Sequence, residues 1–267
     1  MSEMNSLKPM ICIAVSGGPQ TGKTFIAVNL ALAFALQGKR TLFLDMNQFP
    51  DNSGGIFGLH SAHTFQDLLT RKYTLKQIVR SRFGIDVVYY GSRADTSAPI
   101  HARAVHQLLH FLTIYDAVVM DCRNVIPDMS RSLLSLAPLT LMVATPAPEA
   151  ISGAYGLVKA AHAAQLSGRI SLLMNRVHDA AQIRAATTGF DRLTEESLSR
   201  HYDLQGAIPE TVLPFNPIFG VKPLLSADVS NPAAMELLAL SRRLSFDRDA
   251  TVTLSESYIC RLFDVLT

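Results

Sequence analysis

The chain has 267 residues, 48% of them hydrophobic, and its 24 lysines and arginines nearly balance 22 aspartates and glutamates. This length suits one large α/β domain, and the near-neutral charge argues against a strong attraction to nucleic acid along the whole sequence. The three cysteines are far apart and form no CxxC pair, so we expect small hydrophobes and no disulfide framework. No apolar leader and no run of about 18 apolar residues is visible, and we expect a cytoplasmic protein.

Short apolar runs alternate with helical patterns along the chain. The apolar runs predict strands at 10–15, 41–44, 85–90, 117–120, 139–144, 170–174 and 204–208. The segments between them predict helices at 24–37, 64–69, 74–80, 101–113, 130–136, 148–166, 182–201 and 231–244. Strands that are apolar throughout and separated by helices form a mostly parallel sheet covered on both faces. We therefore predict a doubly wound α/β domain over residues 1–246, followed by a tail, 247–267, with a short amphipathic helix.

A phosphate-binding motif lies between the first predicted strand and helix. The segment 17–24 matches G-x-x-x-x-G-K-[ST] in full, with glycines at Gly17, Gly18 and Gly22 and then Lys23 and Thr24. Its glycines let backbone N–H groups approach phosphate oxygens, and the helix N-terminus adds partial positive charge. Lys23 is expected to reach the β- and γ-phosphates, and the Thr24 hydroxyl to ligate Mg²⁺. The motif and its context predict a P-loop NTPase fold.

Two aspartates follow buried strands. Asp121 ends the run 117–120, where an aspartate can hold Mg²⁺ in the Walker B role. Asp45 ends the strand after the P-loop helix. Ligands collect at the carboxyl ends of parallel strands, so we expect both carboxylates beside the phosphates and the metal. Lys23, Asp45 and Asp121 are the predicted catalytic residues, and Thr24 and Asp121 the predicted metal ligands.

These features together resemble the MinD/ParA family of deviant-Walker ATPases. The P-loop begins one strand into the chain, and Asp45 and Asp121 stand at the matching strand ends. The stretches 144–149 (ATPAPE), 154–159 (AYGLVK), 173–176 (LMNR) and 206–210 (GAIPE) are similar to the FlhG (FleN) branch, which controls flagellar number and placement. The resemblance covers residues 11–244.

The resemblance carries several expectations for this chain. It implies ATP as the nucleotide, Mg²⁺ as the metal, and a sandwich homodimer that forms on ATP binding. It implies that Asn175 reads adenine, and that Pro209 and Glu210 lie in the adjoining base-binding loop. A flagellar GTPase or regulator is the implied protein partner, and peripheral contact at the inner face of the membrane is implied for the C-terminal helix.

Two departures from the family pattern concern turnover. The family's signature lysine, which reaches across the dimer to the partner's phosphates, is Gly18 here, and the second aspartate of its switch I pair is Asn47. Losing a positioned cation and a water-orienting carboxylate weakens phosphoryl transfer, because that catalysis consists mostly of positioning and electrostatics. We therefore predict slow ATP hydrolysis. Arg123 is a candidate substitute cation, although a solvated loop arginine is the simpler interpretation.

Two other features have weaker meaning. His106 and His110 have i, i+4 spacing, but no third ligand is near them in sequence, so we do not expect a metal site. The tail has an apolar stripe at helical spacing, accompanied by the single cation Arg261. This favours contact with protein over anionic lipid, although the domain itself, a partner and a membrane are all candidates to cover the stripe: Tyr258, Ile259, Leu262, Phe263 and Leu266.

The leading interpretation is an ATP-binding positioning or regulatory protein with weak ATPase activity. One alternative is a nucleotide-binding or partner-binding switch without turnover. Another is a ParA-like DNA-partitioning ATPase, for which Arg184, Arg192 and Arg200 are candidate contacts. The near-neutral charge makes DNA the less favoured partner.

Overall fold

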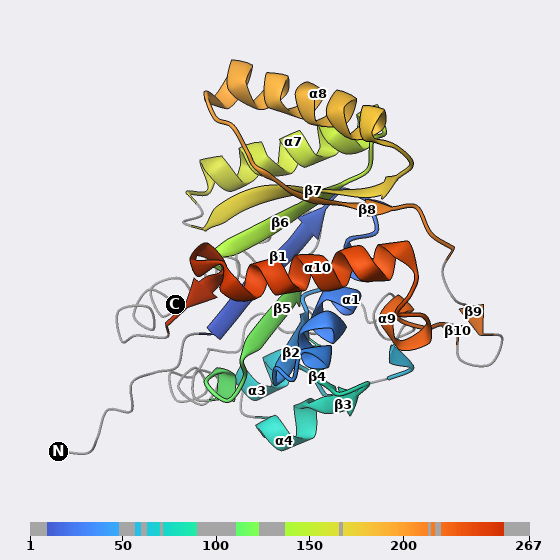
Figure 1. The fold of residues 1–267 in the computed structure, drawn as a ribbon. Coiled ribbons are helices and arrows are strands. Elements are labelled where there is room, and N and C mark those ends of the chain that lie inside the picture. Colours follow the sequence, from blue (N-terminus) through green and yellow to red (C-terminus); the bar gives the residue numbers. More distant parts are fainter. Residues whose placement is uncertain are drawn as a thin grey trace.

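The structure is a computed structural model that describes residues 10–47, 57–59, 63–69, 72–89, 111–122, 137–165, 168–212, 215–216 and 220–253. Its centre is a sheet in the order β3-β4-β2-β5-β1-β6-β7-β8, with β11 paired to β1 (Figure 1). The strands from β4 to β8 along this path pair in parallel, whereas β3 and β11 are antiparallel to their neighbours. The strands are β1 (Met10–Gly17), β2 (Thr41–Asp45), β3 (Arg80–Arg82), β4 (Ile85–Tyr89), β5 (Ala117–Asp121), β6 (Leu139–Ala144), β7 (Arg169–Val177), β8 (Leu204–Pro209) and β11 (Thr251–Val252).

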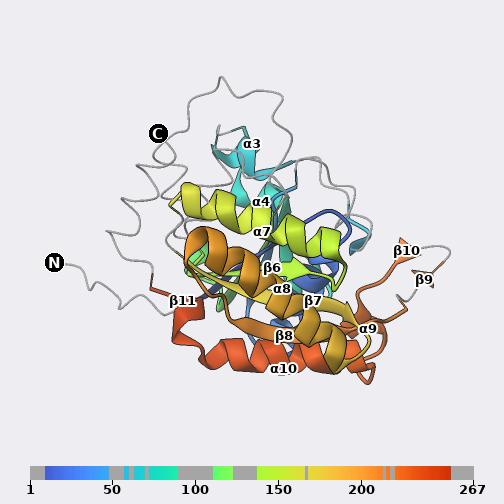
Figure 2. The ribbon, with the colours of Figure 1, turned by 90° about the horizontal axis from the view of Figure 1, so that it is seen from above.

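Helices cover both faces of this sheet, as the apolar strands predict (Figure 2). The helices described are α1 (Lys23–Leu36), α3 (Phe65–Leu69), α4 (Leu75–Ile78), α7 (Pro148–Ala163), α8 (Ala180–Leu198), α9 (Leu224–Ala227) and α10 (Pro232–Phe246). A short pair of strands, β9 (Phe215–Asn216) and β10 (Gly220–Val221), precedes α9. The predicted doubly wound α/β class is confirmed. The predicted helices 101–113 and 130–136 lie wholly or mostly outside the described residues.

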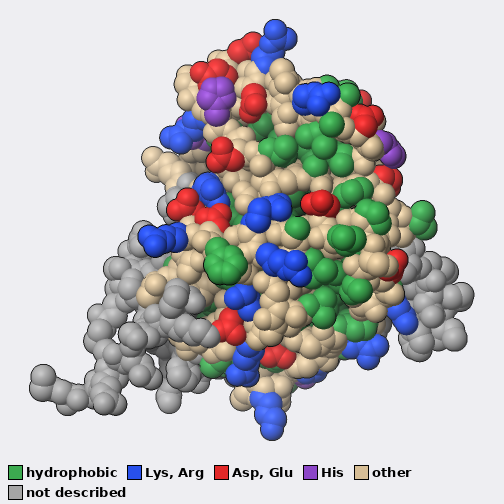
Figure 3. Space-filling model, in the orientation of Figure 1, with side chains coloured by type: hydrophobic (Ala, Val, Ile, Leu, Met, Phe, Trp, Pro, Cys, Tyr) green, Lys and Arg blue, Asp and Glu red, His purple; other side chains and the backbone are tan. Residues whose placement is uncertain are grey.

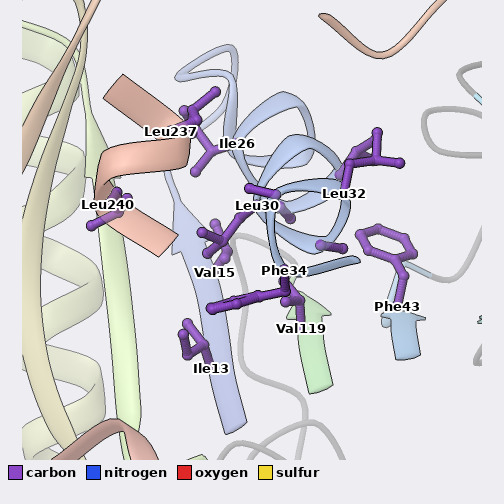
Figure 4. Packing of buried hydrophobic residues seen from close by; sticks show 14 of the residues in the cluster. Ile13, Val15, Ile26, Leu30, Leu32, Phe34, Phe43, Val119, Leu237 and Leu240 are labelled. Carbon is purple, nitrogen blue, oxygen red and sulfur yellow. The ribbon is translucent and has the colours of Figure 1, made fainter. Parts of the chain in front are cut away.

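The core is divided between the two faces by the alternation of side chains along each strand. In β1, Ile11, Ile13 and Val15 face a cluster that includes α1 and α10, whereas Cys12 and Ala14 face the cluster beneath α3 and α4. A third cluster packs α7 and α8 against β6 and β7. Figure 4 shows α1 and α10 side by side over the sheet, with apolar side chains of α1 directed at the strands and at α10. This packing fixes α1, and therefore the P-loop at its start, against the sheet.

Side-chain hydrogen bonds join the end of α1 to α10. The Gln37 side chain donates to the Ser241 hydroxyl at 2.6 Å and accepts from the Ser245 hydroxyl at 3.2 Å. Asn29, which is 1% exposed, accepts from the backbone N–H of Leu225 at 3.0 Å and so anchors α9 to α1. Buried polar groups with such partners restrict the packing to one arrangement.

The predicted domain boundary at residue 246 coincides with the end of α10. Beyond it, Asp247 pairs with Arg169 at the start of β7, and a 3₁₀ turn (Arg248–Ala250) leads into β11, which pairs with β1. The chain therefore continues to contact the domain as far as Val252. The remainder of the predicted tail, including its apolar stripe, lies outside the described residues. Among the described helices, none combines the length and the apolar composition needed to cross a membrane.

Candidate functional site

The P-loop joins the buried strand β1 to the start of α1. Gln20 (φ 57°) and Gly22 (φ 84°) take left-handed backbone angles, and the Thr21 hydroxyl donates to the carbonyl of Gly18 at 2.9 Å. These turns bring the loop around the N-terminus of α1. Gly22 supplies no side-chain cap, and the first turn of α1 has no acidic residue. The free N–H groups and the dipole of this helix end are therefore suited to an anion such as phosphate.

Asn175 holds the P-loop from the carboxyl-terminal part of β7. Its side-chain amide donates to the carbonyl of Thr21 at 2.8 Å, and Asn175 is 3% exposed. A Cβ added to Gly22 would lie 2.4 Å from the amide nitrogen of Asn175, and one added to Gly17 would lie 2.5 Å from the carbonyl oxygen of Val143. The loop is thus packed tightly on the ends of β6 and β7. Asn175 lies at the site, and its reading of adenine stays a prediction.

The predicted base-binding loop follows β8, the neighbour of β7. Pro209 pairs with Val177 at the end of the two strands, and the backbone N–H of Glu210 donates to the carbonyl of Val177 at 3.0 Å. The exposed Glu210 therefore lies one strand away from the end of β7 that carries Asn175. This placement brings Pro209 and Glu210 close to Asn175, and their role in binding a base stays a prediction.

A pair of buried carboxylates lies beside the start of α1. Asp45 ends β2 and Asp121 ends β5, the two residues are partners in adjacent parallel strands, and both are 0% exposed. The Thr24 hydroxyl donates to Oδ2 of Asp121 at 2.7 Å. The side-chain amide of Asn47 donates to Oδ1 of Asp45 at 2.7 Å and to Oδ2 of Asp121 at 2.8 Å. The structure thus brings both strand-end aspartates and the predicted metal-ligating threonine together.

Burial governs the charge state of this pair. Desolvation, followed by the nearby charge of Asp45, raises the pKa of Asp121 from 3.8 to about 7. The hydrogen bonds from Thr24 and Asn47 and the positive charge of Lys23 act in the opposite direction. A cation bound beside this carboxylate would offset its buried negative charge.

The oxygen atoms at this position fit a magnesium ion. Oδ1 of Asp121 is buried and has no hydrogen-bond partner among the described residues, and the Thr24 hydroxyl lies on the other oxygen of the same carboxylate. Hard oxygen donors beside a phosphate cradle are the ligands that Mg²⁺ takes in nucleotide sites. Thr24 and Asp121 would hold the ion, which would neutralise charge on the phosphates. Within the described part of the chain, no further cluster of three His, Cys, Asp or Glu residues suits a metal.

Most predicted site residues therefore meet at the carboxyl ends of the parallel strands. Two contacts of this region are not evident from the sequence: the bridge that Asn47 forms between the carboxylates, and the bond from Asn175 to the loop backbone. Both join segments far apart in the chain, so no local motif marks them. Arg123 and the pair His106 and His110 lie outside the described residues. The predicted residues that meet are Gly17, Gly18, Gly22, Lys23, Thr24, Asp45, Asp121 and Asn175.

The fit of the P-loop predicts a contrast between two of its glycines. Replacing Gly22 by alanine places a Cβ against Asn175 and holds alanine at a positive φ, so stability should fall by at least about 1 kcal/mol. Replacing Gly18 by alanine meets only the Thr21 methyl group at 3.6 Å, an ordinary contact. Urea denaturation of both variants checks the difference. Equal free energies of unfolding for the two would contradict the packing described for Gly22.

The raised pKa predicts how stability depends on pH in the absence of nucleotide and divalent cations. The folded protein keeps the Asp121 proton up to about pH 7, whereas the ordinary carboxyl releases it near 3.8, so the free energy of unfolding should fall as pH rises between these values. Asp121→Asn removes this charge. Its melting temperature should exceed that of wild type at about pH 8, with the difference shrinking toward about pH 5. Thermal denaturation across this range is the measurement, and a less stable variant at the higher pH would contradict the prediction.

No protein-family model matches the chain. Over 215 residues the chain is 27% identical to the antiactivator FleN of Pseudomonas aeruginosa, a stretch that covers 78% of this chain and 77% of FleN. The sequence resemblance to the FlhG (FleN) branch therefore extends over most of both proteins.

Solved structures share the fold at lower identity. A chain of the MinC:MinD cell division protein complex of Aquifex aeolicus aligns with a TM-score of 0.69 at 20% identity, covering 91% of this chain and 98% of that one. MinD of Pyrococcus horikoshii, complexed with Mg-ADP, aligns with a TM-score of 0.66 at 18% identity, covering 88% and 96%. A ParA family ATPase from Chlorobium tepidum aligns with a TM-score of 0.67 at 17% identity, covering 87% and 98%. The chain has the fold of the MinD/ParA P-loop ATPases.

Proposed function

We propose that this chain, with the fold of the MinD/ParA P-loop ATPases and similarity to FleN over most of its length, is an ATP-binding regulator of the MinD/FlhG type that controls flagellar number or placement. The observation that carries the proposal is the complete P-loop, whose Thr24 hydroxyl contacts the buried Asp121 carboxylate at 2.7 Å. The similarity to a protein named as an antiactivator supports a regulatory output.

ATP and Mg²⁺ are the proposed ligands. The helix N-terminus and Lys23 suit a polyphosphate, and the oxygens of Thr24 and Asp121 suit the metal. Turnover is proposed to be slow, because Gly18 offers no cation and the Asn47 amide is engaged with both carboxylates. The same contacts favour the second candidate function, a switch that binds nucleotide without turnover. Calorimetric titration with Mg·ATP tests both candidate functions, because an absence of binding contradicts each of them. Phosphate release on the same sample separates them, because only the slow ATPase releases phosphate.

We propose that the chain dimerises when it binds ATP, and that a partner protein distinguishes the ATP-bound dimer from the other nucleotide states. The site lies at the carboxyl ends of the central parallel strands. A ligand bound there can therefore form part of a surface between two copies of the chain. A MinD structure that contains MinC shows that this fold is used in protein complexes. A flagellar GTPase or regulator is the proposed partner of this chain. The proposed localisation of the chain is the cytoplasm, with peripheral contact at the membrane.

The tail predicts how a partner and a membrane can be told apart. Its apolar stripe includes Leu262 and has one cation, Arg261, so charge attraction to anionic lipid is weak. Leu262→Glu should reduce self-association or partner binding more than it reduces vesicle binding. Light scattering for oligomer size and sedimentation with anionic vesicles check this. A variant that loses vesicle binding and keeps its association state would show that the stripe is a membrane anchor.

For this chain we propose a protein partner in preference to DNA. On the face shown in Figure 3, Lys and Arg side chains are interspersed with Asp and Glu side chains, and they form no continuous basic surface there. The Arg192 side chain itself lies 3.6 Å from the carboxylate of Glu196. Binding to the phosphate backbone depends on clustered cations and falls steeply with salt. Retention on DNA that decreases with salt would favour the ParA-like alternative over the regulatory proposal.

A further inference from the structure

Asn47 lies between the two buried carboxylates of the site. It follows β2 by two residues, and it is half-buried, whereas Asp45 and Asp121 are 0% exposed. The ends of β2 and β5 are fixed there by backbone bonds, since the N–H of Met46 donates to the carbonyl of Asp121 at 3.0 Å. Backbone pairing of β2 and β5 therefore places the two carboxylates side by side, and the Asn47 amide bonds to both.

The chemistry of the groups fixes the orientation of the Asn47 amide. Its nitrogen lies 2.7 Å from Oδ1 of Asp45 and 2.8 Å from Oδ2 of Asp121, and its backbone N–H adds a third bond, of 2.9 Å, to Asp45. Oδ1 of Asp45 and Oδ2 of Asp121 both act as acceptors here, so the NH₂ end of the amide faces them, and each of its two hydrogens has one acceptor. The opposite orientation would place an oxygen against two further oxygens.

The amide compensates the carboxylates without a charge of its own. Hydrogen bonds to ionised acceptors are stronger than bonds between neutral groups, and in a dry site they offset part of the cost of burying two like charges. An aspartate at this position would instead add a third carboxylate to the cluster. A third carboxylate would raise the cost of burying like charges at this position, and a bound cation would offset that cost.

We propose that Asn47 is a positioning residue that bridges Asp45 and Asp121 and keeps the metal-binding side of the site assembled while no cation is bound. This role rests on the proposed function for the identity of the metal site. It also means that Asn47 has a structural task of its own and does not only replace an aspartate. With this bridge, part of the cost of burying the two carboxylates is offset before a divalent cation binds. Nucleotide and metal then arrive at a preformed site.

Thermal denaturation of the full chain without nucleotide tests the bridge, with MgCl₂ or MnCl₂ as the added cation. The melting temperature of wild type should change much less on adding either salt than that of Asn47→Asp does. Asn47→Ala loses the bridge and should melt about 5 °C lower, with no recovery on adding either salt. Asn47→Asp should also melt lower without the cation, and millimolar Mg²⁺ or Mn²⁺ should restore most of the loss, because three carboxylates form an oxygen site for a divalent ion.

A matched variant separates this role from a general need for a buried amide. Asn29 is also buried, but its side chain bonds to backbone groups: it donates to the carbonyl of Phe25 and accepts from the N–H of Leu225. Asn29→Asp should therefore lower the melting temperature without recovery by Mg²⁺ or Mn²⁺. An Asn47→Ala variant within about 1 °C of wild type would overturn the proposal, even if Asn47→Asp does not fold. Because no nucleotide is present, a failure to bind ATP would leave this result unaffected.

Discussion

Replacing Lys23 by alanine is expected to weaken Mg·ATP binding by at least about 100-fold while the fold stays intact. Lys23 is the first residue of α1, where backbone N–H groups already favour phosphate, and its positive charge is close enough to Asp121 to lower the pKa of that carboxyl. Alanine in its place removes the side-chain charge that is proposed to reach the phosphates and keeps the backbone of the loop. Affinity should therefore fall much more than stability.

Calorimetric titration of wild type and Lys23→Ala with Mg·ATP measures this effect, and circular dichroism confirms that the variant is folded. Lys159→Ala is the matched control, because Lys159 is exposed on α7 and its replacement also removes one positive charge. The control should bind as wild type does. Equal affinity of Lys23→Ala and wild type would refute the assignment of the P-loop as the nucleotide site.

The parts of the fold that the sequence predicts are those whose burial is complete. Each residue of β1, β2, β5 and β6 is buried, so each strand is mostly apolar in the sequence, and β2 and β5 end at Asp45 and Asp121. By contrast, β3 consists of Arg80, Ser81 and Arg82, which pair with β4 at the edge of the sheet. An edge strand of this kind leaves no apolar pattern, because its side chains are polar and it is held by backbone pairing and by a bond from the Ser81 hydroxyl to Asp86.

The candidate site divides in the same way between local and distant contacts. The P-loop is evident from the sequence because its spacing is a property of eight adjacent residues. The bond from Asn175 to Thr21 joins residues 154 positions apart, and the bond from Asn47 to Asp121 joins residues 74 apart. The sequence shows that Asn47 lacks a carboxylate, but the packing of β2 beside β5 is needed to show what its amide does. Resemblance indicates which residues matter, and geometry indicates how they act.

The two departures from the family pattern have different structural consequences. A side chain at Gly18 has room, since a Cβ there would meet the Thr21 methyl group at 3.6 Å and the backbone angle is not left-handed. The absence of lysine at this position is therefore not imposed by packing. Asn47, in contrast, bonds to both carboxylates, so an aspartate at this position adds a third negative charge beside them. Restoring lysine at 18 should be neutral for stability, whereas restoring aspartate at 47 should require a cation.

Restoring both groups is expected to raise the rate of ATP hydrolysis by about 10-fold or more over wild type. A cation at position 18 would balance charge that develops on the phosphates. A carboxylate at position 47 would orient the attacking water, a task that the Asn47 amide does not perform while both of its hydrogens are held by Asp45 and Asp121. Saturating Mg²⁺ is part of the assay, because the ion offsets the third carboxylate.

Phosphate release under saturating Mg·ATP measures the rates of wild type, Gly18→Lys, Asn47→Asp and the double variant. Gly18→Ala is the control, since it fills the same space without a charge and should leave the rate unchanged. Each single variant should gain less than the double, because the cation and the oriented water act on the same transition state and are needed together. A MinD/ParA family ATPase that keeps both groups, assayed beside them, sets the scale. If wild type already matches its rate, other residues of this chain compensate for Gly18 and Asn47, and the prediction of slow turnover is wrong.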